Sequence, residues 1–228
     1  MAGPNLRQEH PQVNWDEVAR LYHALWYFGP AGVMPWETMH WMGVPVLKCP
    51  MDTWIYQEII HRTRPEVIIE TGTRFGGSAL YMAHLLDLLG GDGRVISIDI
   101  TMGLVHEPTK RHPRITLIEG SSTDSAIVNQ VANAARGKRT MVVLDSDHAA
   151  AHVLREMELY SPLVTPGHYM IVEDSNVNGH PVIPNFGPGP MEAIEAFMKT
   201  PAAAGWRSDS NCERLLLTWN PRGYLLKS

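Results

Sequence analysis

Apolar residues from Pro65 onward occur in short continuous runs that alternate with longer amphipathic stretches. Runs of four or five apolar residues predict buried strands, and the amphipathic stretches between them predict helices. We expect strands at 67–70, 95–99, 115–119, 141–145 and 169–172, in that order along the chain. We expect helices at 77–89, 124–135, 149–163 and 191–198. This alternation predicts an α/β fold with a mostly parallel sheet that helices cover on both faces.

The tail of the chain predicts an antiparallel edge for this sheet. Residues 213–219 and 224–226 are expected to form two strands. Between them, Asn220-Pro221-Arg222-Gly223 has proline and glycine at the positions that a type I turn favours. The two strands and the turn together predict a C-terminal hairpin.

The first 64 residues differ from the rest, because five of the seven tryptophans lie there. A helix is predicted to begin at Asn14, since Asn14 and Glu17 have the spacing of a capping box, and to end at Gly29. Its apolar positions recur at intervals of three and four residues, and they are Trp15, Val18, Leu21, Tyr22 and Leu25. That spacing predicts that one face of the helix is buried.

The segment from residue 29 to residue 50 is irregular and rich in glycine, proline, methionine and tryptophan. Asp52 then has the position of an N-cap for a second helix, which would run to about His61. Irregular segments of this length are often functional. We therefore expect residues 1–64 to form a helical, aromatic extension that acts as a lid over a cleft. The alternative is an extension that only packs on the core through its aromatic side chains.

Composition narrows the function classes for this chain of 228 residues. Its formal net charge of −5 offers no basic stripe for nucleic acid. No apolar run approaches the roughly 18 residues that a membrane helix needs, and the polar N-terminus does not resemble a signal peptide. Cys49 and Cys212 lie far apart and fit no metal or redox spacing, which favours a reducing cytoplasm. We therefore expect a cytoplasmic protein without nucleic-acid or membrane partners.

Acidic side chains follow or end all five predicted strands. They are Glu70, Asp99, Glu119, Asp145 and the pair Glu173-Asp174. Ligands of open α/β sheets bind beyond the carboxyl ends of the strands, so these side chains are expected to share one rim. A single polar residue commonly marks the exit from a strand. Several like charges on one rim, however, repel one another unless a cation or a donor-rich ligand meets them.

The first strand runs into a glycine-rich turn, Glu70-Thr71-Gly72-Thr73-Arg74-Phe75-Gly76-Gly77-Ser78. Phe75 stands where a G-x-G-x-x-G fingerprint would have its third glycine, which disfavours a nicotinamide cofactor. The turn instead resembles the E-x-G-x-x-x-G motif of class I S-adenosylmethionine-dependent methyltransferases. Glycines let a backbone approach its ligand closely, and the helix N-terminus that follows offers amides to a carboxylate. Asp99 has the position of an acceptor for two ribose hydroxyls.

A second acidic group lies in the later half of the chain. Asp145 and Glu173 are 28 positions apart, enough for one helix and a return strand, so Asp145, Glu173 and Asp174 are expected to converge. Three carboxylates without thiolates or clustered imidazoles favour a hard divalent cation such as Mg²⁺. The alternative is that one of the acidic residues only caps a helix or pairs with an arginine, and Asp147 is the candidate for that role.

Several of these stretches together resemble a known family. They are Lys48-x-Pro50-x-Asp52-x-Trp54, Ile69-Glu70-Thr71-Gly72, Gly76-Gly77-Ser78, Leu144-Asp145-Ser146-Asp147-His148, Val172-Glu173-Asp174 and Asn220-Pro221-x-Gly223-Tyr224-Leu225. Over residues 43–226 the chain is similar to the cephalosporin hydroxylase family, also described as rhamnosyl O-methyltransferase-like. The resemblance implies a class I methyltransferase fold with a Rossmann-like sheet. Residues 65–228 would then be an S-adenosylmethionine-binding catalytic domain with a Mg²⁺ site, whereas residues 1–42 match no pattern.

The resemblance also implies roles for single residues. Asp145, Glu173 and Asp174 would hold the metal. The residues implied to hold the cofactor are Glu70, Gly72, Ser78, Asp99, Ser122 and Asp145. His148 falls where related sugar O-methyltransferases place their catalytic base; the alternative is a hydrogen bond from His148 to a metal-bound carboxylate. Glu173 departs from the pattern of catechol O-methyltransferase, which has a shorter aspartate there.

The leading hypothesis is a Mg²⁺-dependent O-methyltransferase that uses S-adenosylmethionine and acts on a hydroxyl of a sugar or natural-product scaffold. We expect a small-molecule substrate and a homo-oligomer. A hydroxylase is the poorer alternative, because none of the 11 histidines is followed two positions later by the carboxylate that an iron site often uses. A further alternative is a non-catalytic protein that binds S-adenosylmethionine and assists another enzyme.

Overall fold

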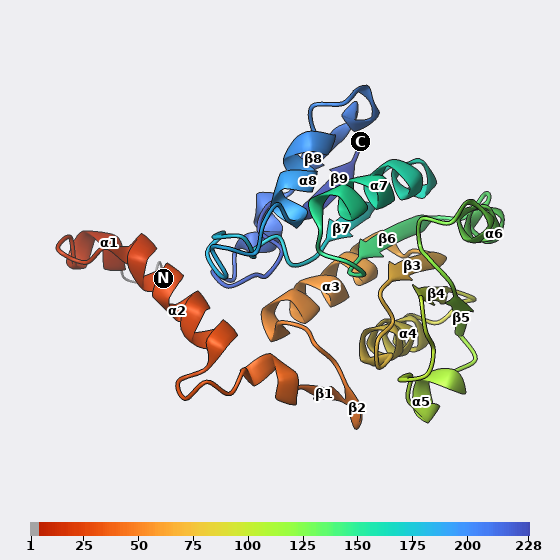
Figure 1. The fold of residues 1–228 in the computed structure, drawn as a ribbon, viewed down its shortest axis with the longest axis horizontal. Coiled ribbons are helices and arrows are strands. Elements are labelled where there is room, and N and C mark those ends of the chain that lie inside the picture. The colour runs from red at the N-terminus through yellow and green to blue at the C-terminus, as the bar shows by residue number, and fades with distance from the viewer. Residues whose placement is uncertain (1–4) are drawn as a thin grey trace.

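The computed structural model describes residues 5–228, and its centre is a seven-stranded sheet with the order β5-β4-β3-β6-β7-β9-β8 (Figure 1). The strands of this sheet are β3 (Val67–Thr71), β4 (Arg94–Asp99), β5 (Ile115–Glu119), β6 (Thr140–Leu144), β7 (Tyr169–Val172), β8 (Trp206–Ser208) and β9 (Tyr224–Lys227). The five strands from β3 to β7 are parallel, whereas β9 runs antiparallel to both β7 and β8. A separate two-stranded sheet joins β1 (His40–Trp41) and β2 (Val44–Pro45). The expected mostly parallel α/β sheet with an antiparallel edge is confirmed.

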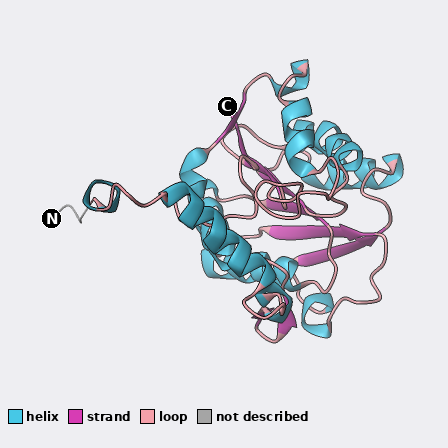
Figure 2. Ribbon diagram, turned by 60° about the vertical axis from the view of Figure 1, so that its left-hand side comes forward, coloured by secondary structure: helices cyan, strands magenta, loops and turns pink. Residues whose placement is uncertain are grey.

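Helices cover both faces of the large sheet (Figure 2). The α-helices are α1 (Leu6–Glu9), α2 (Trp15–Phe28), α3 (Pro50–Thr63), α4 (Gly77–Leu89), α5 (Glu107–Lys110), α6 (Ser125–Ala135), α7 (Ala150–Tyr160) and α8 (Pro190–Phe197). Shorter 3₁₀ helices are η1 (Pro35–Thr38), η2 (Ser161–Leu163), η3 (Pro201–Ala203) and η4 (Ser210–Glu213). Helices α6, α7 and α8 cover one face, and α3 and α4 cover the other.

Alternation along each strand divides the buried apolar side chains between these two faces. In β3, Val67 and Ile69 belong to the cluster with α7 and α8, whereas Ile68 belongs to the cluster with α3 and α4. All three side chains are 0% exposed. Since both faces are covered, every position of a central strand is buried, which explains the continuous apolar runs in the sequence.

The C-terminal edge differs from the predicted hairpin. Residues 213–219 do not form a strand; β8, which begins at Trp206, pairs with β9 instead. The reason is that Thr218 and Trp219 are held against α3 by hydrogen bonds, so this segment is not free to join the sheet. The Asn220–Gly223 turn does form, with the Gly223 N–H donating to the Asn220 carbonyl at 2.8 Å. Arg222 has a φ of +60°, so the turn resembles type II rather than the expected type I.

Helix α2 has the predicted cap but not the predicted burial. The Asn14 side chain accepts the Glu17 N–H at 3.2 Å, and the helix ends before Gly29. The apolar stripe that was expected to be buried is instead exposed, at 46% for Val18 and 53% for both Leu21 and Leu25. The helix lies at the side of the body, with α1 projecting beyond it (Figure 1), and buries His23 and Tyr27 instead.

The start of α3 also corrects a prediction. Cys49, not Asp52, occupies the N-cap position, and Pro50 is the first helical residue. The Asp52 carboxylate is 2% exposed and accepts hydrogen bonds from Thr218 Oγ1 at 2.5 Å, the Trp219 N–H at 2.8 Å and Tyr224 Oη at 2.7 Å. The acidic side chain therefore fastens α3 to the C-terminal segment instead of capping its own helix.

The expected division of the chain at residue 64 stays a prediction. The prediction grouped α3 with the N-terminal extension, whereas Ile55, Ile59 and Ile60 of this helix lie in one of the two core clusters of the sheet.

Cys49 and Cys212 are both buried and not joined in a disulfide. None of the helices within residues 5–228 is long and apolar enough to cross a membrane.

Candidate active site

The turn between β3 and α4 lies directly against the end of β6. Gly72 has a φ of +88°, and a Cβ atom there would come within 1.8 Å of the Asp145 carbonyl oxygen. Only glycine fits such a contact in this backbone conformation. The Gly72 N–H donates to the Ile98 carbonyl at 2.8 Å, so the turn is fixed between β4 and β6.

Helix α4 begins at this turn with free amides. Gly76 is its N-cap, and no side chain within residues 5–228 caps the helix. A Cβ atom at Gly77 would lie 2.2 Å from the Pro45 carbonyl oxygen, which shows how closely β2 passes the start of the helix. Gly77 and Ser78 both line a cavity, so the positive end of the helix dipole faces that space.

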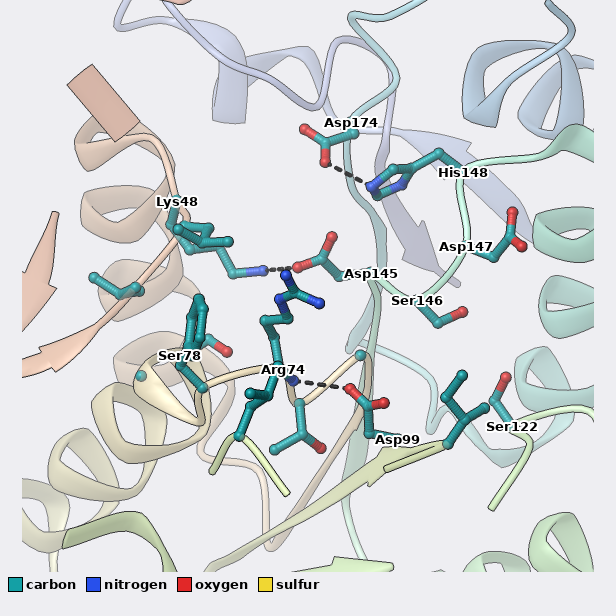
Figure 3. Close-up of a pocket in the computed structure, with 18 of the residues that line it drawn as sticks. Lys48, Arg74, Ser78, Asp99, Ser122, Asp145, Ser146, Asp147, His148 and Asp174 are labelled. Carbon is teal, nitrogen blue, oxygen red and sulfur yellow. Dashed lines mark hydrogen bonds and ion pairs between the residues drawn. The ribbon is translucent and has the colours of Figure 1, made fainter. Parts of the chain in front are cut away.

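This cavity has a volume of about 900 Å³ and contains most of the predicted site residues (Figure 3). The predicted residues that line it are Gly72, Ser78, Asp99, Ser122, Asp145, His148 and Asp174. Glu70 and Glu173 do not line it. Instead, these two carboxylates are buried behind its wall, with exposures of 0% and 4%.

Asp99, at the end of β4, has a carboxylate oriented by backbone amides. Its Oδ2 accepts the Arg74 N–H at 2.8 Å, and its Oδ1 accepts the Thr101 N–H at 3.2 Å. Arg74 has a φ of +47°, which turns its N–H toward this carboxylate across the glycine-rich turn (Figure 3). Asp99 remains partly exposed to the cavity, so its oxygens are also open to hydroxyl donors.

Glu70 lies beneath the same turn. Its carboxylate accepts hydrogen bonds from Ser78 Oγ and, at 2.5 Å, from Ser97 Oγ. Burial raises the pKa of Glu70, while the positive charge of Lys48 and the two serine hydroxyls oppose that rise. The strand continues through Thr71, so Glu70 is an interior strand residue that faces α4 and not the rim. Its direct contact with a cofactor stays a prediction.

Asp145, His148 and Asp174 come together at the opposite wall of the cavity. One potential ligand atom from each lies within 4.8 Å of the other two. His148 Nε2 is 3.3 Å from Asp174 Oδ2, and the two side chains point toward one another (Figure 3). Asp174 has a φ of +53°, and its N–H donates to Asn220 Oδ1 at 3.1 Å. Because of this left-handed backbone conformation, the Asp174 side chain points in a different direction from the side chain of Glu173, the residue before it.

Lys48 occupies the space between Asp145 and Glu173. Its Nζ is 2.5 Å from Asp145 Oδ2 and 2.5 Å from Glu173 Oε1, and the side chain is only 4% exposed (Figure 3 draws the Asp145 pair). Tyr56 Oη of α3 donates to the same Glu173 oxygen at 2.6 Å. Lys48 and Tyr56 are not among the predicted site residues. The signal for Lys48 was its match to the family motif before α3.

Burial dominates the electrostatics of this wall. It raises the pKa of Asp145 to about 6 and of Glu173 to about 7, with further increases from neighbouring carboxylates and an opposing effect of Lys48. Burial alone would lower the pKa of Lys48, but the carboxylates around it raise it, so the ammonium stays charged. Burial alone would likewise lower the pKa of His148. The charges of Asp174, Asp145 and Glu173 outweigh that effect, so the pKa is raised. Asp145, Glu173 and Asp174, called the carboxylate wall below, thus raise one another's pKa values, and a cation bound among them would relieve that repulsion.

A polar network that no sequence pattern predicts lies beside Ser122. His152 Nε2 is 3.2 Å from both Ser122 Oγ and Ser146 Oγ, and Ser146 donates to the buried Glu156 Oε1 at 2.7 Å. Nearby, Asp147 Oδ1 accepts the Ala149 N–H at 2.7 Å just before α7 begins. Asp147 thus orders the loop before α7 but does not cap the helix, whose N-cap is Ala149, and it also lines the cavity.

The remaining part of the cavity is aromatic and apolar. Tyr27 and Trp36 reach it from the N-terminal segment, and Trp219 from the segment before β9. The three rings pack against one another with centroids 5.5 to 5.9 Å apart. Val177, Ile183 and Phe186 of the loop after β7 complete this part of the lining. The cavity therefore has a polar half at the strand ends and an aromatic half.

The strand order, the glycine turn before α4 and the acidic strand ends define a class I methyltransferase fold. Residues 34–228 match the family described as Rhamnosyl O-methyltransferase/CmcI, and the chain belongs to that family. The expected family resemblance is therefore confirmed.

Related proteins and solved structures match this chain over most of its length. A rhamnosyl O-methyltransferase of Mycobacterium bovis (strain BCG / Pasteur 1173P2) is 41% identical over 217 residues, which are 93% of this chain and 86% of that protein. A rhamnosyl O-methyltransferase of Mycobacterium leprae (strain TN) is 46% identical over 185 residues, or 80% of this chain and 78% of that protein. A solved structure described as "cmcI-D160 Mg-SAM" is similar with a TM-score of 0.67 and 23% identity, covering 90% of this chain and 84% of that one.

Proposed function

We propose that this protein transfers a methyl group from S-adenosylmethionine to a hydroxyl of a sugar or a related natural-product scaffold, with the help of Mg²⁺. The observation that carries the proposal is one cavity of about 900 Å³ in which Asp99 and the glycine turn share the space with Asp145, His148 and Asp174. A volume of this size lies at the upper end of the usual range for ligand sites, which leaves room for a cofactor and an acceptor.

The polar half of the cavity suits the cofactor. The Asp99 carboxylate, fixed by two backbone amides, would accept hydrogen bonds from the ribose hydroxyls. The free amides at the start of α4, with Ser78, would meet the carboxylate of the methionine part. Because Gly72 has no side chain, the turn that would hold the cofactor can lie directly against the backbone at Asp145. Ser122 would line the adenosine end of the site.

The donor set at the wall fits Mg²⁺, because carboxylate oxygens dominate it and no thiolate is present among the residues that line the cavity. Asp145 and Asp174 would hold the ion together with Glu173, which the family resemblance implies as the third ligand. A divalent cation bound there would lower the pKa of the acceptor hydroxyl and fix its position. The names of the mycobacterial relatives and the Mg²⁺ of the similar solved structure support the proposal.

His148 is the proposed base. It lines the cavity beside the two aspartates, and Asp174 at 3.3 Å would stabilise the imidazolium that forms when His148 accepts the hydroxyl proton. The second interpretation gives His148 a supporting role, in which its imidazole only orients the Asp174 carboxylate. Substitution of His148 separates the two, because only the first predicts a loss of turnover that excess Mg²⁺ does not restore.

The aromatic half of the cavity is the proposed acceptor site, and the segment that carries Tyr27 and Trp36 is the proposed lid. Aromatic linings with a few polar groups are usual in small-molecule sites. The names of the mycobacterial relatives favour a rhamnosyl acceptor. Deletion of residues 1–42 is expected to remove acceptor recognition while cofactor binding persists, because the polar half of the cavity lies downstream.

The direct test is the formation of S-adenosylhomocysteine from S-adenosylmethionine with a phenyl rhamnoside as acceptor. We expect Mg²⁺-dependent product that stops on chelation and resumes when Mg²⁺ is restored. Full turnover with verified removal of the metal would overturn the metal-assisted part. Stoichiometric iron in the purified protein, with an oxidised acceptor and no methyl transfer, would favour the hydroxylase alternative instead.

A further inference from the structure

Lys48 brings a positive charge from the N-terminal part of the chain into the carboxylate wall. Its Nζ bridges the carboxylates that follow two neighbouring strands, β6 at Asp145 and β7 at Glu173, at 2.5 Å each. The side chain lines the cavity and is 4% exposed, so the ammonium has little access to bulk water. An ion pair on the protein surface would contribute little, but a buried charge acts strongly on every other charge nearby.

The ammonium is also fixed in place. Lys48 lies two residues before the start of α3, and the Asp52 carboxylate in the first turn of that helix is tied to the C-terminal segment by three hydrogen bonds. One turn later, Tyr56 donates to the same Glu173 oxygen that Lys48 contacts. Lys48 is therefore held beside a rigid helix and cannot swing away without breaking buried contacts.

The charges at the wall have a simple sum. Asp145, Glu173 and Asp174 carry three negative charges when ionised, and Lys48 carries one positive charge. With His148 neutral, as its proposed role as a base requires, two negative charges remain. A divalent cation neutralises that remainder. Without the lysine, the same three carboxylates would match a trivalent cation better.

We propose that Lys48 is a positioning residue that sets the charge preference of the cation site, by leaving a remainder of two negative charges for the ion. This inference rests on the proposed function, since it assumes that the carboxylate wall binds a cation. Lys48 itself contacts the carboxylates of Asp145 and Glu173, and its charged ammonium would offer the ion no ligand atom. Its removal is expected to shift the preference of the site from divalent toward trivalent ions, whatever its effect on overall affinity.

The test is a competition between Tb³⁺ and Mg²⁺ on the full chain. Tb³⁺ luminescence sensitised by tryptophan reports binding, and Mg²⁺ displaces the ion. In Lys48→Met the ratio of Tb³⁺ affinity to Mg²⁺ affinity is expected to rise at least about tenfold, because one unit charge at about 5 Å acts more strongly on three charges than on two. In Lys48→Arg, which keeps the charge, the ratio is expected to stay within about twofold. Asp174→Asn, which removes a wall carboxylate, serves as the control that the signal comes from this site.

The outcomes separate this inference from the proposed function. A salt bridge of purely structural importance would change both affinities alike, so an unchanged ratio in Lys48→Met overturns the inference and leaves the proposed function intact. If the wild-type protein binds neither ion, the metal part of the proposed function fails together with the inference. If Lys48→Met does not fold, as judged by circular dichroism, Lys48→Gln carries the same expectation, because glutamine is neutral and can still donate hydrogen bonds to both carboxylates.

Discussion

The strands beneath the cavity and the helix beside it bury their apolar residues to opposite extents. Ile68 and Ile69 of β3 are 0% exposed, whereas Leu21 and Leu25 of α2 are each 53% exposed. The strands are covered on both faces, so any apolar run there becomes core. Helix α2 is held through its buried His23 and Tyr27, so the periodicity of its sequence indicates a helix without indicating which side is covered. Periodicity predicts an element more reliably than it predicts the partner of that element.

The largest expected effect lies at the strand ends. With His148 as the base, His148→Ala should lower turnover by about 10²- to 10⁴-fold while Mg²⁺ affinity stays nearly unchanged. Rates of S-adenosylhomocysteine formation and calorimetric Mg²⁺ titration measure both quantities. His61→Ala, at an exposed histidine of α3, is the matched control and should leave both values alone. Recovery of most of the rate in excess Mg²⁺ would show instead that His148 only orients Asp174.

The junction between the N-terminal part and the core should be nearly as sensitive. Asp52→Ala leaves three donors from the C-terminal segment without their acceptor in a buried place. We expect a loss of about 3–5 kcal/mol in the free energy of unfolding, measured by urea titration. Asp16→Ala, at a side chain that is 84% exposed, should cost less than about 0.5 kcal/mol. Equal losses in the two variants would contradict the assigned role of Asp52.

Acid is expected to loosen the docking of α2 on the body of the protein. Burial lowers the pKa of His23 from 6.5 to about 4, and His23 Nε2 lies 2.9 Å from Asn176 Nδ2 in the core. Because the undocked or unfolded state binds a proton more readily, the stabilisation is complete above pH 6.5. It declines as the pH falls toward 4, by on the order of 3 kcal/mol. Hydrogen exchange of the α2 amides between pH 7 and 4 measures this loss.

His23→Gln is the control for that experiment, since glutamine can keep a hydrogen bond to Asn176 but does not titrate in this range. Other buried groups respond to acid in both proteins, so the difference between them isolates His23. The same acid response in the variant would show that His23 does not control the docking of α2.

The smallest expected effect concerns the exposed stripe of α2. Leu21→Ala should change the free energy of unfolding by less than about 0.5 kcal/mol. Leu80→Ala is the matched control, because Leu80 of α4 is 2% exposed and its truncation should cost about 2–5 kcal/mol. Thermal unfolding compares the two. A large loss at Leu21, together with a smaller sedimentation coefficient, would show that another copy of the chain covers the stripe, in line with the expected homo-oligomer.

Much of the fold follows from the sequence because the central strands are buried on both faces. All five parallel strands are found within one residue of their expected bounds. Contacts between residues that lie far apart in sequence explain the failures. The segment 213–219 has the pattern of a strand, but Thr218 and Trp219 bond to Asp52, which is more than 160 positions earlier. No local pattern contains that contact.

Local sequence patterns also predict the site residues only in part, because a strand that continues by one residue changes which side chain reaches the cavity. Asp99, Asp145 and Asp174 line the cavity as expected for strand ends. Glu70 does not, because β3 continues to Thr71 and the alternation of the strand directs Glu70 toward α4. Glu119, at the end of the edge strand β5, accepts the Met102 N–H and stays outside the cavity. Three converging carboxylates predict a positive charge among them. The family motif singles out Lys48, but no local pattern brings it to Asp145, which lies 97 positions later.

The strand order also bears on how the protein emerges from the ribosome. β9 lies inside the sheet between β7 and β8, yet it is the last strand of that sheet to be synthesised. Asp52 receives its three donors, and Asp174 its Asn220 partner, from residues 218–224. A nascent chain that ends before this segment therefore has the glycine turn and the first five strands but an open edge at β7. Completion of the carboxylate wall therefore waits for residues 218–224, whereas the contacts of the glycine turn and of Asp99 all come from residues synthesised earlier.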